Sequence, residues 1–120
     1  MKSVACVLLL LLLTGCGKAG TSPAAAPAPP QPSEIASRFG CVGFAPETTQ
    51  ELYVSEVGRC TLGQDTAVRV LTFHDDTGRD AFVKIAASFG PSYAVGDMFV
   101  VEGTSTTVDT VDSKLGTTRA

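Results

Sequence analysis

Apolar residues recur with three different spacings along this 120-residue chain, and each spacing predicts a different element. Residues 4–13 are continuously apolar. A membrane-spanning helix needs about 20 such residues, so this run is too short to span a membrane and instead fits the apolar region of a cleaved signal peptide. Residues 66–73, TAVRVLTF, alternate with a period of two and are rich in β-branched side chains, which is typical of a strand. Residues 79–89 predict an amphipathic helix. Its apolar face consists of Phe82, Ile85, Ala86 and Phe89.

Shorter patterns predict a first helix and a first strand before residue 66. Ser33 can cap a helix over residues 34–39, which Gly40 ends. Residues 43–50 contain a proline and two threonines and are expected to form a loop. Residues 51–61 then predict a strand that forms a hairpin with residues 66–73.

Two further segments are predicted after the amphipathic helix. Residues 93–95 and 98–102 flank a Gly-Asp pair, which predicts either a tight hairpin or one strand bent at the glycine. Residues 106–115 place three apolar side chains at helical spacing before Gly116, so they predict a last helix.

The element order α-β-β-α-β(β)-α indicates the fold class. Such an order is typical of an α+β domain, in which helices pack on one face of an antiparallel sheet. We expect a sheet of three or four strands, helices on one face and one disulfide, within a single domain over residues 34–120. About 87 residues suit one small core.

The first sixteen residues end in the sequence Leu13-Thr14-Gly15-Cys16. A basic Lys2, a short apolar run and two small residues precede the cysteine, and this pattern resembles the lipobox of bacterial lipoprotein precursors. The resemblance implies that residues 1–15 are a signal peptide and that Cys16 is lipidated. It also implies a lipid-anchored protein on the outer, extracytoplasmic face of the cell membrane. A conventional secretory signal with an incidental cysteine is the alternative.

Residues 16–33 are rich in proline and alanine and hold five of the seven prolines. With no apolar periodicity they cannot form a core, and proline favours extended polyproline II. They predict a tether that holds the domain up to about 50 Å from the lipid. A proline-rich ligand for a binding domain is the alternative.

Charge limits the partners of the domain over residues 34–120. It carries seven Lys and Arg against twelve Asp and Glu, a formal net charge of −5. Because phosphate backbones and anionic headgroups repel such a surface, we exclude nucleic acid as a partner. Contact with the membrane is expected through the lipid on Cys16 alone.

Four cysteines divide by position. Cys6 lies in the signal and Cys16 at the lipidation site, which leaves Cys41 and Cys60 in an oxidising compartment. We expect a disulfide between them that stabilises the domain by roughly 3 kcal/mol. A redox pair or a metal site is disfavoured, because there is neither CxxC spacing nor a histidine cluster.

Candidate chemistry is sparse. His74-Asp75-Asp76 is the one cluster suited to acid–base work or cation binding, but aspartates between a strand and a helix are also typical caps. Asp109 and Asp112 share a face of the last predicted helix and form either solvated surface or an acidic docking face. No nucleophile elbow, zinc-protease motif or phosphate loop is present, so we expect no cofactor and no enzymatic activity.

The domain resembles small secreted or lipid-anchored actinobacterial proteins in the residues Cys41, LYVSEVGRCTL, TFHD, AFVKIAASFG and YAVGDMFVV. The resemblance implies a cysteine-linked hairpin before a helix, but no assigned activity. We expect a binding module for an envelope protein, peptide or wall component. The alternatives are a small-ligand or cation sensor, and an inhibitor of an exported enzyme.

Overall fold

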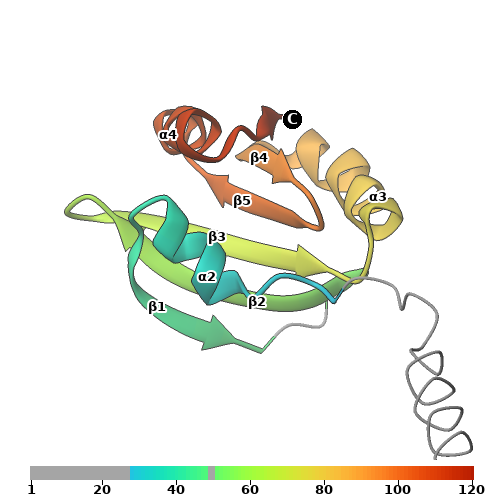
Figure 1. Ribbon diagram of the computed structural model, residues 1–120. Helices are drawn as coiled ribbons and strands as arrows, with labels where there is room; N and C mark the ends of the chain where they lie inside the picture. The colour runs from blue at the N-terminus through green and yellow to red at the C-terminus, as the bar shows by residue number, and fades with distance from the viewer. Residues whose placement is uncertain (1–27, 49–50) are drawn as a thin grey trace, which may run out of the picture.

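A computed structural model describes residues 28–48 and 51–120. The predicted signal peptide, the predicted lipidation site Cys16 and the first part of the predicted tether lie outside the described residues. The elements are, in chain order, α2 (Pro32–Arg38), β1 (Val42–Glu47), β2 (Val54–Leu62), β3 (Thr66–Phe73), α3 (Asp76–Ala86), the 3₁₀ turn η1 (Ala87–Phe89), β4 (Ser92–Gly96), β5 (Phe99–Gly103), α4 (Ser105–Leu115) and β6 (Thr118–Arg119) (Figure 1).

One antiparallel sheet of six strands, in the order β1-β2-β3-β5-β4-β6, forms the centre of the described domain (Figure 1). The α+β class and the antiparallel sheet are confirmed, but the expectation of three or four strands is wrong. The added strands are β1 and the two-residue β6, which lie at the two edges. Neither has a period-two apolar pattern, because an edge strand buries little of its surface.

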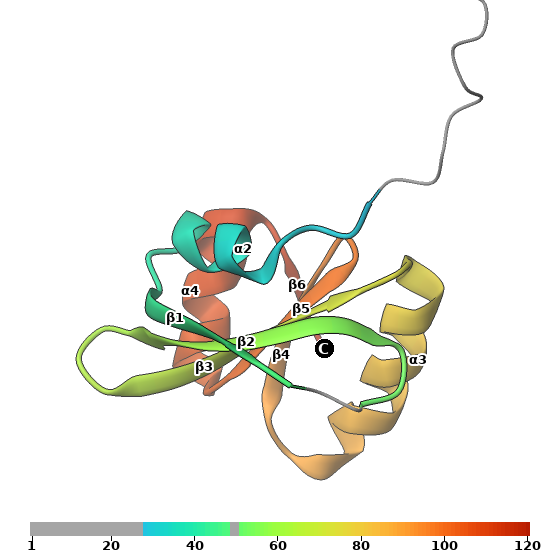
Figure 2. The ribbon, with the colours of Figure 1, turned by 90° about the horizontal axis from the view of Figure 1, so that it is seen from below.

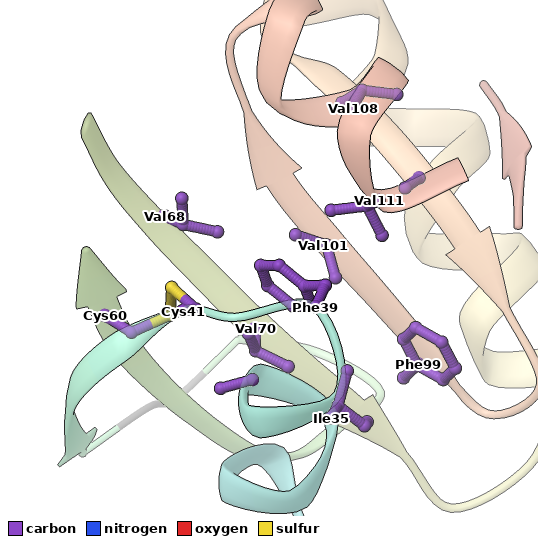
Figure 3. Packing of buried hydrophobic residues seen from close by; sticks show 12 residues of the cluster. Ile35, Phe39, Cys41, Cys60, Val68, Val70, Phe99, Val101, Val108 and Val111 are labelled. Carbon is purple, nitrogen blue, oxygen red and sulfur yellow. A yellow bond between two sulfur atoms is a disulfide. The ribbon is translucent and has the colours of Figure 1, made fainter. Parts of the chain in front are cut away.

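Helices α2 and α4 pack on the same face of the sheet, where the larger core lies (Figure 3). Phe39, the residue after α2, and Val111 of α4 are both fully buried there, against alternate residues of β3 and β5. The disulfide between Cys41 and Cys60 is confirmed and is buried at the margin of this core. Cys41 lies between α2 and β1, and Cys60 lies in β2, so the bond links the segment after α2 to the sheet.

Helix α3 packs on the opposite face (Figure 2). It covers a smaller core in which Phe82 contacts the rings of Phe73 and Tyr93, with centroids 5.3 and 6.2 Å apart. The expectation that all helices share one face is therefore wrong. Both faces of β3 are buried, by Val68 and Val70 on one side and by Leu71 and Phe73 on the other, so the sheet needs cover on both sides.

Residues 42–47 form strand β1, where the sequence predicts a loop over residues 43–50. Pro46 is compatible with this strand because β1 lies at the sheet edge, where one side of the backbone needs no partner. The ring of Phe44 covers Gly58 of β2 so closely that an added Cβ would lie 2.2 Å from it. The absence of a side chain at Gly58 thus lets the edge strand pack its aromatic ring against β2.

Two helix starts differ from the sequence expectation. Helix α2 begins at Pro32 after Gln31, which makes no side-chain cap, so Ser33 is not the cap and the helix starts inside the predicted tether. Helix α3 begins at Asp76 rather than at residue 79, since Asp75 caps it and Gly78 takes part in its first turn. Of the two alternatives for residues 93–102, the hairpin is observed, as β4 and β5.

Candidate functional site

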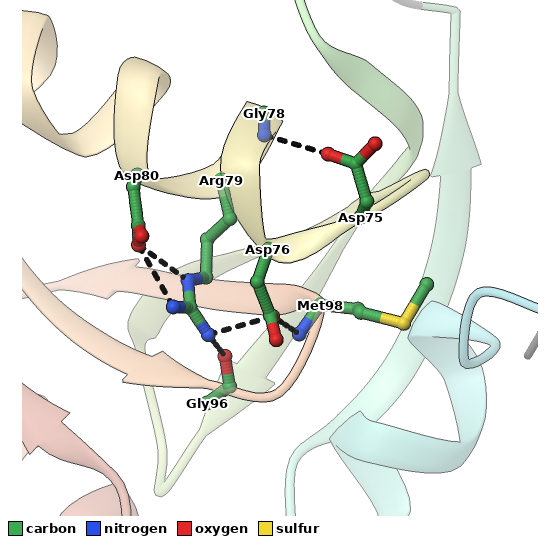
Figure 4. Close-up of polar contacts among 7 residues, drawn as sticks. All are labelled: Asp75, Asp76, Gly78, Arg79, Asp80, Gly96 and Met98. Carbon is green, nitrogen blue, oxygen red and sulfur yellow. Dashed lines mark hydrogen bonds and ion pairs between the residues drawn. The ribbon is translucent and has the colours of Figure 1, made fainter.

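The His74-Asp75-Asp76 turn joins β3 to α3 and uses its first carboxylate as a cap (Figure 4). Asp75 has an extended backbone, and its Oδ1 accepts the N–H of Gly78 at 2.7 Å. This satisfies one of the free donors at the helix start. Asp75 is therefore the N-cap of α3, in agreement with the capping interpretation of this turn.

Asp76 holds the start of α3 to the β4–β5 turn (Figure 4). Its Oδ1 accepts the Met98 N–H at 2.8 Å and lies 2.8 Å from Nη1 of Arg79. Arg79 in turn donates to the carbonyl of Gly96 at 2.6 Å and pairs with Asp80. The carboxylate and the guanidinium are thus both engaged in fixing the position of the helix.

These contacts bear on the candidate metal ligands His74, Asp75 and Asp76. His74 is exposed, and the two carboxylates accept backbone N–H donors. Across residues 28–48 and 51–120, no three His, Cys, Asp or Glu side chains gather closely enough to hold a metal ion. The structure therefore does not bring the three residues together as a ligand set.

The two aspartates of α4 contact the end of the described chain. Asp109 pairs with Arg119 of β6, and the hydroxyl of Thr117 donates to Asp112. The interpretation of both as a plain solvated face is therefore incomplete. Their carboxylates attach the short strand β6 to the helix.

A charge cluster that the sequence analysis missed lies on the α3 side of the sheet, where the helix does not cover it. Arg69 of β3 is its centre, 2.7 Å from Glu51, 3.4 Å from Glu47 and 3.6 Å from Glu102. Burial alone lowers the pKa of Arg69, but the hydrogen bond to Glu51 and the three carboxylate charges together raise it. Arg69 therefore stays charged and is held by acidic neighbours.

Tyr93 of β4 is buried between this charge cluster and α3. Burial, together with the charge of Glu102 and a hydrogen bond to it, raises the pKa of Tyr93 to about 12. The phenol is thus protonated at neutral pH. Tyr93 is only 3 % exposed, so its ring belongs to the smaller core.

A hollow of about 630 Å³ lies beside β6, at the edge of the sheet. We call it the edge hollow. Apolar side chains line part of it, from α3, β4, β5 and α4 respectively: Val83, Val95, Phe99 and Leu115. Three arginines also line it, namely Arg38, Arg79 and Arg119. An apolar wall with a few converging polar groups is typical of small-molecule sites.

A second surface feature is apolar. Four large side chains on or near α3 are 43 to 76 % exposed, and we call them the α3 patch: Leu52, Tyr53, Ile85 and Phe89. The first three line one groove, and Phe89 lies in the 3₁₀ turn four residues after Ile85. The groove of about 230 Å³ runs between the first two and α3, with Phe82 in its lining and Glu51 at the same site. Tyr53 has a positive φ of 73°, an unusual conformation for a side chain of this size.

The interior offers no competing site. In the described part of the chain, no buried side-chain nitrogen or oxygen lacks a hydrogen-bond partner. Ligand chemistry is therefore to be sought on the surface, in the charge cluster, the edge hollow and the α3 patch.

No protein family, curated protein or solved structure matches the chain. None of the helices formed by residues 28–48 and 51–120 has the length and apolar character needed to cross a membrane.

The sequence contains a signal for only some of these features. Arg69 lies on the same face of β3 as the buried Leu71 and Phe73, and Glu102 follows three buried residues of β5. These two charged residues mark the point in each strand where the surface is no longer covered by α3. The edge hollow has no such signal, because its arginines come from α2, α3 and β6, which are distant in sequence.

Proposed function

We propose that this protein is a lipid-anchored, extracytoplasmic binding module without enzymatic activity, and that it binds an exported protein or peptide through the α3 patch. The N-terminal lipobox pattern and the proline-rich tether support the location. The exposed apolar side chains beside α3 are the observation that carries the binding role.

Exposed apolar area at the α3 patch favours association. Phe89 is 76 % exposed and Leu52 is 69 % exposed, whereas some other phenylalanine and leucine side chains of the domain are fully buried. The largest apolar patch of a monomer is often a binding site. Covering the patch with a partner would gain about 25 cal/mol for each Å² of apolar area removed from water.

Charge selects the type of partner. The domain carries a formal net charge of −5, and Glu51, which is paired with Arg69, lines the groove of the patch. A second copy of the chain would bring like charges together, whereas a basic partner would be attracted. We therefore infer a partner that presents apolar side chains beside lysine or arginine.

Tyr93 is poorly suited to act as a general base at neutral pH. A general base works best when its pKa lies near the operating pH, whereas that of Tyr93 is about 12. The carboxylates around Arg69 are engaged with its guanidinium, so they are poorly placed to accept a proton.

Site-specific photocrosslinking tests the docking surface. A benzophenone amino acid is placed at Ile85 in the patch or, as a control, at Gln64 in the exposed β2–β3 turn of the full chain. We expect one discrete adduct from position 85 in the intact envelope, no adduct from position 64, and loss of the adduct with Leu52→Asp. Equal adducts from both positions, or none from position 85, would contradict the docking surface.

Membrane fractionation tests the anchor separately. Cys16→Ala removes the thiol that the lipobox pattern assigns to lipidation, so the protein should leave the membrane fraction. Cys6→Ala is the matched control and should leave the distribution unchanged. Retention of the Cys16→Ala protein on the membrane would show that the anchor is not a lipid on this residue.

A further inference from the structure

We propose that the edge hollow binds a small carboxylate that carries an apolar ring or chain, with Arg38 as the residue that recognises the carboxylate. This site goes beyond the proposed partner-binding function. It uses different residues from the α3 patch and can be tested independently of it.

The size of the edge hollow fits a small molecule. Its volume of about 630 Å³ lies within the range of roughly 300–1,000 Å³ that is common for ligand sites. Helices from opposite faces of the sheet contribute to it, since Val83 belongs to α3 and Leu115 to α4. Their side chains provide part of its apolar lining.

The three arginines of the edge hollow differ in their availability. Arg79 is held by Asp76, Asp80 and a backbone carbonyl, and Arg119 is held by Asp109 and Ser105. Arg38, in the last turn of α2, is exposed and has no ion pair within the described part of the chain. Its guanidinium is therefore the one of these three that is free to bind an anion.

The chemistry of a guanidinium beside an apolar wall selects the ligand class. Arginine binds a carboxylate through two parallel hydrogen bonds, which a neutral or cationic head cannot form equally well. The apolar walls, which include Val95 and Phe99, provide a surface for a ring or chain. Asp97 also lines the hollow, and its charge opposes an anion.

Ligand-observed NMR on the full chain tests the site. The protein is held in nanodiscs of zwitterionic lipid, with empty nanodiscs as background, and 3-phenylpropanoate is the probe. We expect saturable binding that is weakened at least fivefold by Arg38→Gln. Lys84→Gln removes an exposed cation of α3 that does not line the hollow, and it should leave the affinity within twofold.

Two comparisons distinguish recognition of the carboxylate from purely apolar binding. The neutral 3-phenylpropanamide should bind at least fivefold more weakly than the carboxylate, and Asp97→Asn should strengthen binding of the carboxylate. Equal affinity for acid and amide, equal effects of Arg38→Gln and Lys84→Gln, or no signal above empty nanodiscs would each overturn the proposal. Loss of the α3 patch by Leu52→Asp should leave this binding unchanged.

Discussion

Helices α3 and α4 have the same length but different relations to the sheet. Each has 11 residues and an N-cap side chain that accepts the N–H three residues later. Helix α4 fully buries Val108 and Val111, whereas no residue of α3 is fully buried, and Ile85 is 56 % exposed. The difference indicates that α4 completes the core, while α3 also presents apolar surface to the outside.

The width of the apolar arc explains the difference between the two helices. In α4, Val108, Val111 and Leu115 form one narrow stripe that the sheet can cover. In α3, the side chains of Phe82, Val83 and Ala86 pack against the core. Ile85, together with Phe89 just beyond the helix, then remains outside it.

The largest expected effect on stability comes from the disulfide on the α2–α4 side. The double variant Cys41→Ala, Cys60→Ala should lower the free energy of unfolding by about 3 kcal/mol, because the open chain gains conformational entropy. Urea denaturation of the full chain measures the loss, and reduction of the unaltered protein should reproduce it. A loss below about 1 kcal/mol would mean that the bridge adds little to this core.

Matched truncations compare the two helices directly. Val111→Ala in α4 should cost about 2–3 kcal/mol, because it leaves a cavity in a fully buried site. Ile85→Ala in α3 should cost less than about 0.5 kcal/mol, as is usual for exposed positions. Denaturation midpoints at equal m-values provide the measurement. Similar costs at the two sites would remove the distinction between the helices.

Alkaline titration tests burial beneath α3. Because the pKa of Tyr93 is raised to about 12 in the folded state, its contribution to stability is complete below pH 10 and is lost as the pH rises toward 12. The chain has two tyrosines and no tryptophan, so in Tyr53→Phe the tyrosinate absorbance reports Tyr93 alone. Its midpoint in the folded protein should lie near pH 12. A midpoint near pH 10 would show that the phenol is solvated.

The smallest of these effects concerns the caps, where the two helices should behave alike. Asp75→Ala and Thr104→Ala each remove an oxygen that accepts a backbone N–H, at 2.7 and 3.1 Å respectively. Each should cost about 1 kcal/mol, and Asp75→Asn should retain most of the stability. Thermal melts can detect a loss of this size. No loss for Asp75→Ala would indicate that its carboxylate has another role.

The central hairpin and the last helix could be predicted from the sequence because their patterns are local. Residues 66–73 alternate over a full strand, and β3 has those bounds; the helix predicted over residues 106–115 is α4 within one residue. Strand β1 was missed because Pro46 suggests a loop unless its edge position is known. The face on which α3 packs depends on the crossing from β3 to β4, which a local pattern does not contain.

The candidate sites were less predictable than the fold. Asp75 was recognised as a capping candidate, because the cap and its helix are adjacent in sequence. The charge cluster joins Glu47, Arg69 and Glu102, which come from three strands, and the edge hollow depends on packing at the sheet edge. Ile85 and Phe89 of the α3 patch were predicted as part of an apolar helix face, but periodicity does not show what covers such a face.

Chemical labelling in the intact envelope tests most directly whether α3 presents a covered binding surface. Ile85→Cys on α3 and Thr106→Cys on α4 both place a thiol at an exposed position of the full chain. A maleimide reagent should label position 106 equally in the envelope and after purification. It should label position 85 several-fold more slowly in the envelope than after purification. Equal labelling of position 85 in both states would contradict the claim that a partner covers this helix.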